Sequence, residues 1–182
     1  MRWMIASDIH GSAKYCEQMF TRYREEQADR LILLGDLLYH GPRNDLPEGY
    51  APKEVIKLLN DHAGEIFCVR GNCEAEVDQM VLDFPVMAEY ALLSIGRHLI
   101  YMTHGHHANE LNPPLLKPGD YLLCGHTHVS KCTDHGDFIY LNPGSISLPK
   151  EDTLRSYMIF DEKSFIWKCL DDRKVYMRRE IV

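Results

Sequence analysis

Short apolar runs that end in metal-binding side chains recur along this sequence. Five such runs each lead directly into a short segment that combines Asp, Asn or His with Gly or a second His. These segments are Asp8-Ile9-His10, Gly35-Asp36, Gly71-Asn72, His104-Gly105-His106 and Gly125-His126-Thr127-His128. A short apolar run stopped by such a segment is typical of a buried strand that passes into a loop. The pattern therefore predicts a sheet whose strand ends carry these side chains.

The first half of the chain alternates predicted strands and helices. The expected strands are residues 2–6, 30–34 and 66–70. Ser12 can cap a helix, and Pro52 stands in the first turn of a second one. The first helix has apolar residues at helical spacing, namely Cys16, Met19, Phe20 and Tyr23. Strands and helices in this order predict parallel β-α-β units.

The second half of the chain is richer in strands. The expected strands are residues 86–94, 97–103, 121–124, 131–133, 138–141, 156–160, 165–170 and 174–179. Gly96 and the polar residues 134–137 favour hairpin turns. We find no linker, repeat or low-complexity tract, so we expect residues 1–182 to form one domain. Two sheets face to face, with helices outside, would bury both halves in one core.

Composition restricts the classes of function. The net charge is -7, which disfavours stable binding to nucleic acid, although bound metals would still attract a small anion. No stretch approaches the ~20 apolar residues of a membrane span. The N-terminal apolar run is too short for a signal peptide. The six cysteines form no CxxC pair and are interpreted as reduced, which indicates a cytoplasmic protein.

The polar segments are expected to meet at one edge of the structure, because ligands of α/β sheets bind at the carboxyl ends of strands. Asp8 and His10 are one residue apart, which on a strand places both side chains on one face. The carboxylate of Asp36 can bridge two ions. The other donors are Asn72, His104, His126 and His128. Seven donors around two ions leave room for water, as a catalytic metal site requires.

The order of these motifs resembles the calcineurin-like metallophosphoesterase superfamily. The segments closest to its YfcE-like phosphodiesterase family are residues 40–44, 47–52, 71–74 and 142–145. The resemblance covers essentially the whole chain. It implies a four-layer α/β/β/α sandwich of two mixed β-sheets flanked by helices.

The resemblance also implies how the metal ions are held. One ion would be held by Asp8, His10, Asp36 and His128, and the other by Asp36, Asn72, His104 and His126. Manganese is the usual metal, and zinc, iron, nickel or cobalt are possible because ligand type does not choose among them. Two ions ~4 Å apart would make a bridging hydroxide that attacks a phosphodiester in line. Asn72 would orient and polarise the phosphate ester through the second ion.

Four further residues are candidates for the reaction or for substrate binding. Cys73 occupies a position that is histidine in much of the superfamily and cysteine in the YfcE-like branch. A thiol is a weak donor, so it would favour substrates with good leaving groups, or it only fills space. His106 could contact phosphate or supply a proton, or it orients a neighbouring ligand. Arg43 could bind the part of the substrate that is not transferred, or it is a solvated charge; Asn44 is a second candidate in the same loop.

We therefore expect a metal-dependent phosphodiesterase that acts on a small phosphate ester. A phosphomonoesterase or a cyclic-nucleotide phosphodiesterase on the same site is the first alternative. A non-catalytic scaffold is the second, since the superfamily includes a retromer sorting subunit. The seven competent donors favour an enzyme. The physiological substrate stays open, and a homo-oligomer is possible because the last strands have exposed edges.

Overall fold

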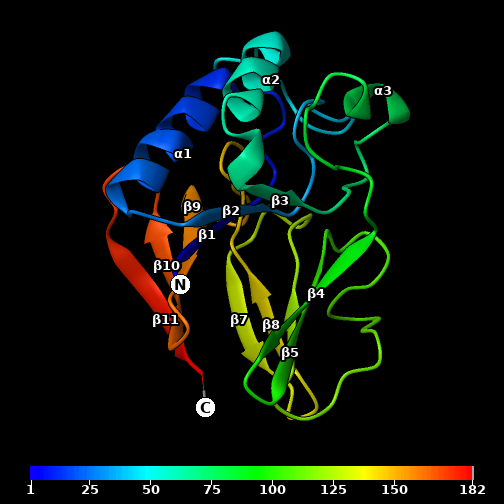
Figure 1. Ribbon diagram of the computed structural model, residues 1–182, viewed down its shortest axis with the longest axis vertical. Helices are drawn as coiled ribbons and strands as arrows, with labels where there is room; N and C mark the ends of the chain where they lie inside the picture. The colour runs from blue at the N-terminus through cyan, green and yellow to red at the C-terminus, as the bar shows by residue number, and fades with distance from the viewer. Residues whose placement is uncertain (182) are drawn as a thin grey trace.

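The centre of the computed structural model, which describes residues 1–181, consists of two β-sheets packed face to face (Figure 1). The strands of the first sheet are β1 (Trp3–Ala6), β2 (Arg30–Leu33), β3 (Ile66–Cys68), β9 (Ser156–Phe160), β10 (Ser164–Cys169) and β11 (Val175–Glu180). Their order across the sheet is β11-β10-β9-β1-β2-β3. The sheet is mixed, because β1 is parallel to β2 and antiparallel to β9.

The second sheet is also mixed. Its strands are β4 (Tyr90–Ile95), β5 (His98–Thr103), β6 (Tyr121–Leu123), β7 (Lys131–Asp134) and β8 (Ile139–Asn142). They lie in the order β4-β5-β6-β8-β7, with β5, β6 and β8 parallel and the two outer strands antiparallel to their neighbours. The prediction of two mixed sheets flanked by helices is confirmed.

The two long helices cover the outer face of the first sheet (Figure 1). Helix α1 (Ala13–Glu25) begins after Ser12, whose hydroxyl accepts a hydrogen bond from the Tyr15 amide at 3.3 Å. Helix α2 (Pro52–Asn60) begins with a proline, as predicted. A 3₁₀ turn (Ala63–Glu65) leads into β3, and a short helix α3 (Glu76–Gln79) follows it.

Apolar side chains on both faces of β1 and β2 hold the layers together. Met4 and Leu33 face the helices, whereas Ile5 and Ile32 face the second sheet. Such double-faced burial explains why these strands are continuous apolar runs in the sequence. Each fully buried aliphatic side chain contributes about 1.5–3 kcal/mol to stability. The indole of Trp167 in β10 also donates a hydrogen bond across the sandwich to the Asn142 carbonyl at 2.7 Å.

Two details differ from the prediction. The strand expected at residues 86–94 begins only at Tyr90, because Val86 packs into the helix-side core and its amide bonds to Gln79 at 2.9 Å. Helix α3 has four residues, which is too short to give a periodic signal.

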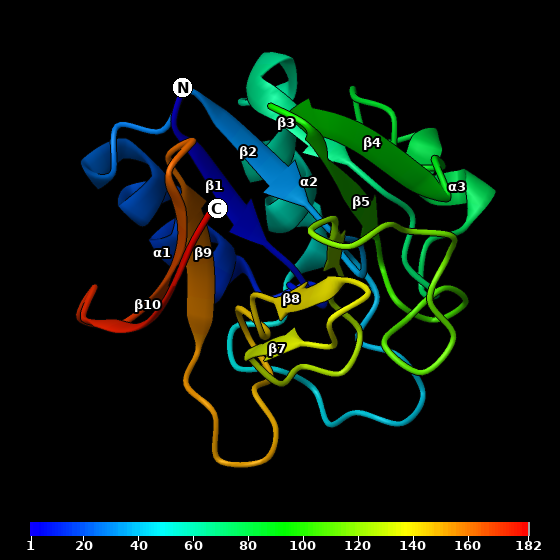
Figure 2. The ribbon, with the colours of Figure 1, turned by 90° about the horizontal axis from the view of Figure 1, so that it is seen from below.

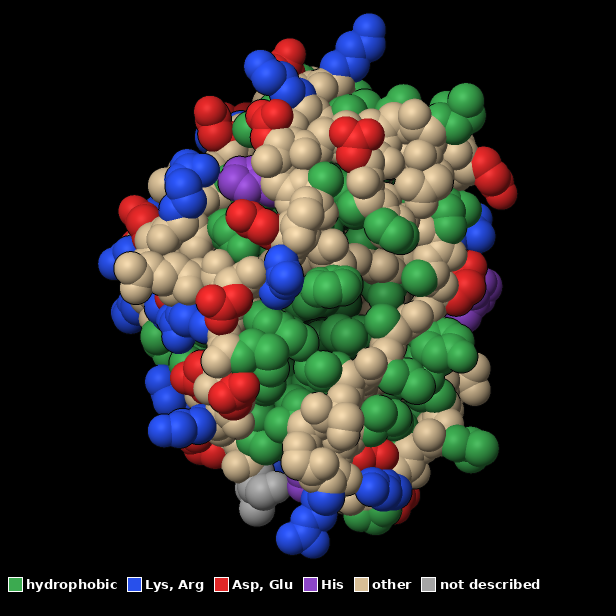
Figure 3. All heavy atoms as spheres, viewed as in Figure 1, with side chains coloured by type: hydrophobic (Ala, Val, Ile, Leu, Met, Phe, Trp, Pro, Cys, Tyr) green, Lys and Arg blue, Asp and Glu red, His purple; other side chains and the backbone are tan. Residues whose placement is uncertain are grey.

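One edge of the sandwich is apolar. Figure 3 shows hydrophobic side chains gathered in the middle of the face that Figure 1 presents, between the sheets. A hollow of about 290 Å³ lies there, between Ile32 and Phe67 of one sheet and Ala91 and Met102 of the other. Its lining within residues 1–181 includes none of the predicted metal donors.

The polar end of the molecule is built differently. In Figure 2 the arrows of β1 and β2 point the same way, toward the loops that follow them. Those loops carry the first three predicted metal donors. None of the helices in residues 1–181 has both the length and the apolar character needed to cross a bilayer.

Candidate metal centre

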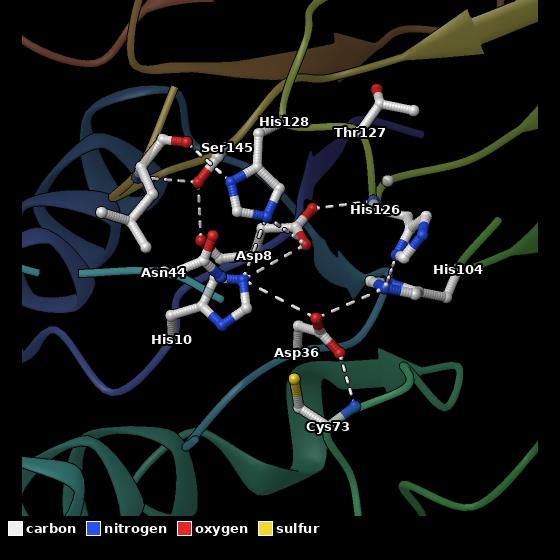
Figure 4. Close-up of polar contacts among 12 residues, drawn as sticks. Asp8, His10, Asp36, Asn44, Cys73, His104, His126, Thr127, His128 and Ser145 are labelled. Carbon is white, nitrogen blue, oxygen red and sulfur yellow. Dashed lines mark hydrogen bonds and ion pairs between the residues drawn. The ribbon is translucent and has the colours of Figure 1, made fainter. Parts of the chain in front are cut away.

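Side chains from the loops after β1, β2, β3, β5 and β6 converge at this end of the sandwich (Figure 4). Asp8 Oδ1 lies 3.6 Å from His10 Nε2 and 3.3 Å from His128 Nε2. Asp36 Oδ2 lies 3.6 Å from His10 Nε2 and 3.5 Å from His104 Nε2. Asp36 is therefore within reach of two separate groups of donors, although the residues come from distant parts of the sequence.

The loops that carry the donors have strained backbones. Asp8 and His10 lie in the loop after β1, with φ of 58° and 49°, so the prediction that they share the face of a strand is wrong. Asp36, His126 and His128 also have positive φ. Such a conformation costs of order 1–3 kcal/mol for a residue with a side chain, and it persists only where the surroundings fix it. In this conformation the side chains of these residues lie together in one cluster (Figure 4).

Glu74 fixes the loop that carries Asp36. Its carboxylate accepts hydrogen bonds from the amides of Asp36 and Leu37, both at 2.8 Å. Glu74 is buried, and burial followed by the nearby charge of Asp36 raises the pKa of its carboxyl above 4.5. No motif in the sequence predicts this role of Glu74. Glu74 follows Gly71-Asn72-Cys73 and also accepts a hydrogen bond from the Gly71 amide, but Asp36 and Leu37 lie in a different loop.

The Gly-His-Thr-His loop is fixed from two sides. The side chain of Asn142 donates a hydrogen bond to the Gly125 carbonyl at 2.7 Å, and the His126 amide donates to Asp8 Oδ2 at 3.0 Å. A Cβ atom on Gly125 would lie 2.0 Å from Ser7 Oγ, so no larger residue fits there. Ser145 Oγ in turn donates to the Asp8 carbonyl at 2.8 Å. The Asn142 segment therefore supports the loop rather than entering the site.

Each of three imidazole rings is held in a fixed orientation by the backbone. The Nδ1 atoms of His10, His104 and His128 lie 2.8, 2.6 and 2.7 Å from the carbonyl oxygens of Tyr39, Leu34 and Leu148. A carbonyl only accepts hydrogen bonds, so each Nδ1 carries a proton and each Nε2 has a free lone pair when the ring is neutral. Backbone contacts of this kind orient histidines that bind metals.

The inward nitrogens face one another across short distances. His10 Nε2 lies 3.1 Å from His128 Nε2, and His104 Nε2 lies 3.1 Å from both His126 Nδ1 and the Asn72 amide oxygen. Asp8 Oδ1 is buried and has no hydrogen-bond partner. Lone pairs and a carboxylate oxygen gathered in this way require positive charge between them. The donor set therefore fits divalent transition metals.

Protons supply part of that charge when no metal is bound. Burial alone would lower the pKa of His104, but the carboxylates of Asp36 and Asp8 raise it to about 9. Burial likewise opposes ionisation of Asp8, yet His10 and His128 hold its pKa well below 3.8. A metal that binds here must displace the proton of His104.

Asn72 and Cys73 lie at the edge of this cluster. The Cys73 amide donates a hydrogen bond to Asp36 Oδ1 at 2.9 Å, and the Asn72 amide nitrogen donates to Cys73 Sγ at 3.3 Å. Burial and the Asp36 carboxylate raise the pKa of the Cys73 thiol far above its ordinary value. Cys73 is therefore a protonated thiol rather than a nucleophilic thiolate.

A polar cleft opens beside the cluster. We call the buried donors of the cluster the floor: Asp8, His10, Asp36, His104 and His128, of which Asp36 and His128 line the cleft. We call the more exposed lining residues outside the predicted metal donors the wall: Arg43, Asn44, Cys73 and Lys150. The predicted substrate-binding residues Arg43 and Asn44 do line this cleft. The Asn44 amide, however, donates to the His40 carbonyl at 2.9 Å, so it also stabilises its own loop.

His106 lies next to the cluster but lines a neighbouring hollow. Its ring centroid is 5.4 Å from that of His104 and 6.3 Å from that of His126. The hollow that it lines is shared with His126, Asn109 and Tyr140, not with Arg43 or Cys73. Burial and the nearby histidines lower the pKa of His106 to about 4, so the ring is neutral at pH 7.

Comparison with known proteins gives matches that cover most of the chain. The family model of the calcineurin-like phosphoesterase superfamily domain matches residues 1–164. The chain is 41% identical over 175 residues to Phosphodiesterase YfcE of Escherichia coli (strain K12), which covers 96% of the chain and 95% of that protein. It is 27% identical over 167 residues to the probable metallophosphoesterase YsnB of Bacillus subtilis (strain 168), with 87% and 83% covered.

Solved structures agree with these matches. The structure of YfcE, a phosphoesterase from E. coli, superposes with a TM-score of 0.96 at 40% identity and covers 100% of both chains. A Vps29 mutant from Entamoeba histolytica gives a TM-score of 0.65 at 21% identity, again over 100% of both chains. At that identity the second likeness shows a shared fold alone.

Proposed function

The chain belongs to the calcineurin-like phosphoesterase superfamily, and we propose that it is a phosphodiesterase that uses two divalent metal ions. The observation that carries the proposal is the position of Asp36. Its Oδ2 atom lies about equally far from His10 Nε2 and His104 Nε2, at 3.6 and 3.5 Å. A carboxylate in that position is suited to bridge two ions.

We assign the donors to two groups that share Asp36. The first would consist of Asp8, His10, Asp36 and His128, and the second of Asp36, Asn72, His104 and His126. Ligand atoms of Asp8, His10 and His128 lie within 4.8 Å of one another, which supports the first group. The second group is supported by His104 Nε2, which lies 3.1 Å from both His126 Nδ1 and the Asn72 amide oxygen and 3.5 Å from Asp36 Oδ2. We expect manganese first, while zinc, iron, nickel and cobalt suit the same nitrogen and oxygen donors.

Two bound ions would supply a lowered pKa for a water between them and positive charge for the phosphoryl oxygens. The protein holds the inward nitrogens of His10, His104 and His128 in place before substrate binds, so little reorganisation is needed during the reaction. The amide oxygen of Asn72 lies 3.1 Å from His104 Nε2, so Asn72 orients the imidazole of His104 within the second group.

We assign smaller roles to Cys73 and His106. Cys73 faces the cleft as a protonated thiol, which is a weak hydrogen-bond donor, so we expect little help for a leaving alkoxide. This favours diesters whose leaving group departs without a proton. His106 contacts the ring of His104 and is proposed to position it rather than to touch the substrate.

Two other functions use the same site. A phosphomonoesterase or cyclic-nucleotide phosphodiesterase is the nearer alternative, since both need the same two ions. A scaffold is the second, because the Vps29 structures share the fold. The presence of all seven candidate donors supports an enzyme over a scaffold.

We propose that the 182 residues act as one domain on a small phosphate ester in the cytoplasm. All six cysteines, which lie within the described residues, are free, as suits a reducing compartment.

The test compares bis-p-nitrophenyl phosphate with p-nitrophenyl phosphate. Protein stripped of metal should cleave neither, and added manganese should restore cleavage of the diester above that of the monoester. Metal content is measured on the same samples. A preference for the monoester would favour the phosphomonoesterase, and protein with two ions that cleaves neither ester would favour the scaffold.

A further inference from the structure

Two positively charged side chains line the cleft beside the floor. They are Arg43, from the loop after β2, and Lys150, from the segment between β8 and β9. Both are exposed. Within residues 1–181 neither has a carboxylate at ion-pair distance, in contrast to Lys168, which lies 2.7 Å from Glu26. Their charges are therefore available to a ligand in the cleft.

The position of Lys150 is fixed by the loop of His128. The Lys150 amide donates a hydrogen bond to the His128 carbonyl at 3.2 Å, and its own carbonyl accepts one from Thr153 Oγ1 at 2.8 Å. The next residue, Glu151, lines a different hollow, with Lys131. Lys150 is thus held beside a floor residue, while the adjacent acid faces elsewhere.

The floor does not need these two cations to bind a simple diester. Two divalent ions would outweigh the carboxylates of Asp8 and Asp36, and a phosphodiester carries a single negative charge. The chain as a whole has a net charge of -7, so Arg43 and Lys150 do not belong to a generally basic surface. Two cations in the wall, separate from the metal donors, suit a second anionic group on the substrate.

We propose that Arg43 and Lys150 bind a second phosphate group, and that the preferred substrates are phosphodiesters that carry a further phosphate ester. The proposal rests on the phosphodiesterase function above. Arg43 can bind phosphate through two parallel hydrogen bonds, whereas Lys150 provides a point charge. Lys150 is a binding residue that no motif in the sequence had indicated.

The test uses the p-nitrophenyl ester of thymidine 5′-phosphate, with and without a 3′-phosphate. Wild-type protein loaded with manganese should have a kcat/KM about tenfold higher for the 3′-phosphorylated ester, since a charged hydrogen bond contributes about that factor. Lys150→Met should reduce this ratio toward one. Lys163→Met, which removes an exposed lysine in the β9–β10 turn, is the matched control and should keep the ratio.

Binding is measured separately by calorimetry on the same metal-loaded proteins. Thymidine 3′,5′-bisphosphate should bind wild type about tenfold more tightly than thymidine 5′-phosphate, and Lys150→Met should lose most of that difference. Equal affinity of wild type for both nucleotides, or an unchanged ratio in Lys150→Met, would overturn the proposal. If wild-type protein bound both nucleotides as expected but cleaved neither ester, the result would instead contradict the phosphodiesterase function.

Discussion

The floor and the wall of the cleft are built by opposite means. Each floor residue is at most 2% exposed, and the three rings are bonded to backbone carbonyls. In the wall, Arg43 and Lys150 are exposed and have no acidic partner within residues 1–181. Floor geometry is therefore fixed by the whole fold, whereas the wall consists of residues from three loops.

This difference separates two requirements of an active site. Groups that bind metals must be placed within about 0.5 Å before the substrate arrives, which needs rigid support. Groups that choose among substrates can change without disturbing the core. The strained backbone at Asp8, His10 and Asp36 belongs to the floor and is stabilised by buried neighbours such as Glu74. Changes in the floor should affect metal binding and folding, and changes in the wall should affect substrate preference.

The largest effect is expected for Asp36→Asn. Asparagine keeps the shape and the hydrogen bond from the Cys73 amide but cannot bridge two ions as a carboxylate does. We expect kcat to fall by about 10³-fold or more, because both ions of the proposed centre would contribute to the reaction. Metal content should fall below two ions per chain, and the increase in Tm on adding manganese should shrink.

Asp137→Asn is the matched control, since it makes the same chemical change on an exposed turn. It should leave rate, metal content and Tm unchanged. If Asp36→Asn bound two ions and kept normal activity, Asp36 would not be a required bridge between them. Asp36 would then no longer support the difference between floor and wall.

Gly125→Ala should act through the fold of the floor. Its Cβ would lie 2.0 Å from Ser7 Oγ and 2.8 Å from Asp8 Oδ2, so neighbouring atoms must shift. Overpacking of this kind costs about 1–3 kcal/mol. Chemical denaturation of the metal-free protein should show a decrease in the free energy of unfolding of that size, and metal affinity should fall with it.

Gly64→Ala is the comparison for this change, because a Cβ there meets no atom within 4 Å. It should leave the free energy of unfolding within about 0.5 kcal/mol of wild type. If Gly125→Ala were equally harmless, the floor would be more adaptable than its contacts indicate.

The sequence was informative about the floor because strands and metal donors have local signals. Apolar runs located the strands that lead to Asp8, Asp36 and His104, and the donor types indicated metal. The left-handed backbone of Asp8 and His10 could not be read from spacing, which assumes that a strand continues. What bends the chain there is tertiary contact with Ser145 and the loops around it.

The wall and the supports of the floor were harder to predict. Glu74 and Asp36 are 38 residues apart, and nothing in either segment alone indicates their hydrogen bond. Lys150 belongs to no sequence motif. It lies beside the cleft because its backbone amide donates a hydrogen bond to the His128 carbonyl. Local patterns therefore reveal candidate metal donors, while residues that depend on the meeting of two loops require the structure.

The smallest effect, and one confined to the wall, is expected for Cys73→His. An imidazole in place of the thiol can donate a proton to the leaving group, a role worth about 10²–10⁴-fold when the geometry is ideal. Cys73 is only half-buried, and the cleft around it accommodates a thiol rather than an imidazole ring. We therefore expect about a tenfold gain in kcat on bis-p-nitrophenyl phosphate. Metal content, measured on the same samples, should stay the same. Cys73→Ser, which has no titrating group near pH 7, should stay within about twofold of wild type. A loss of activity in Cys73→His with both ions bound would mean that this part of the wall is as constrained as the floor.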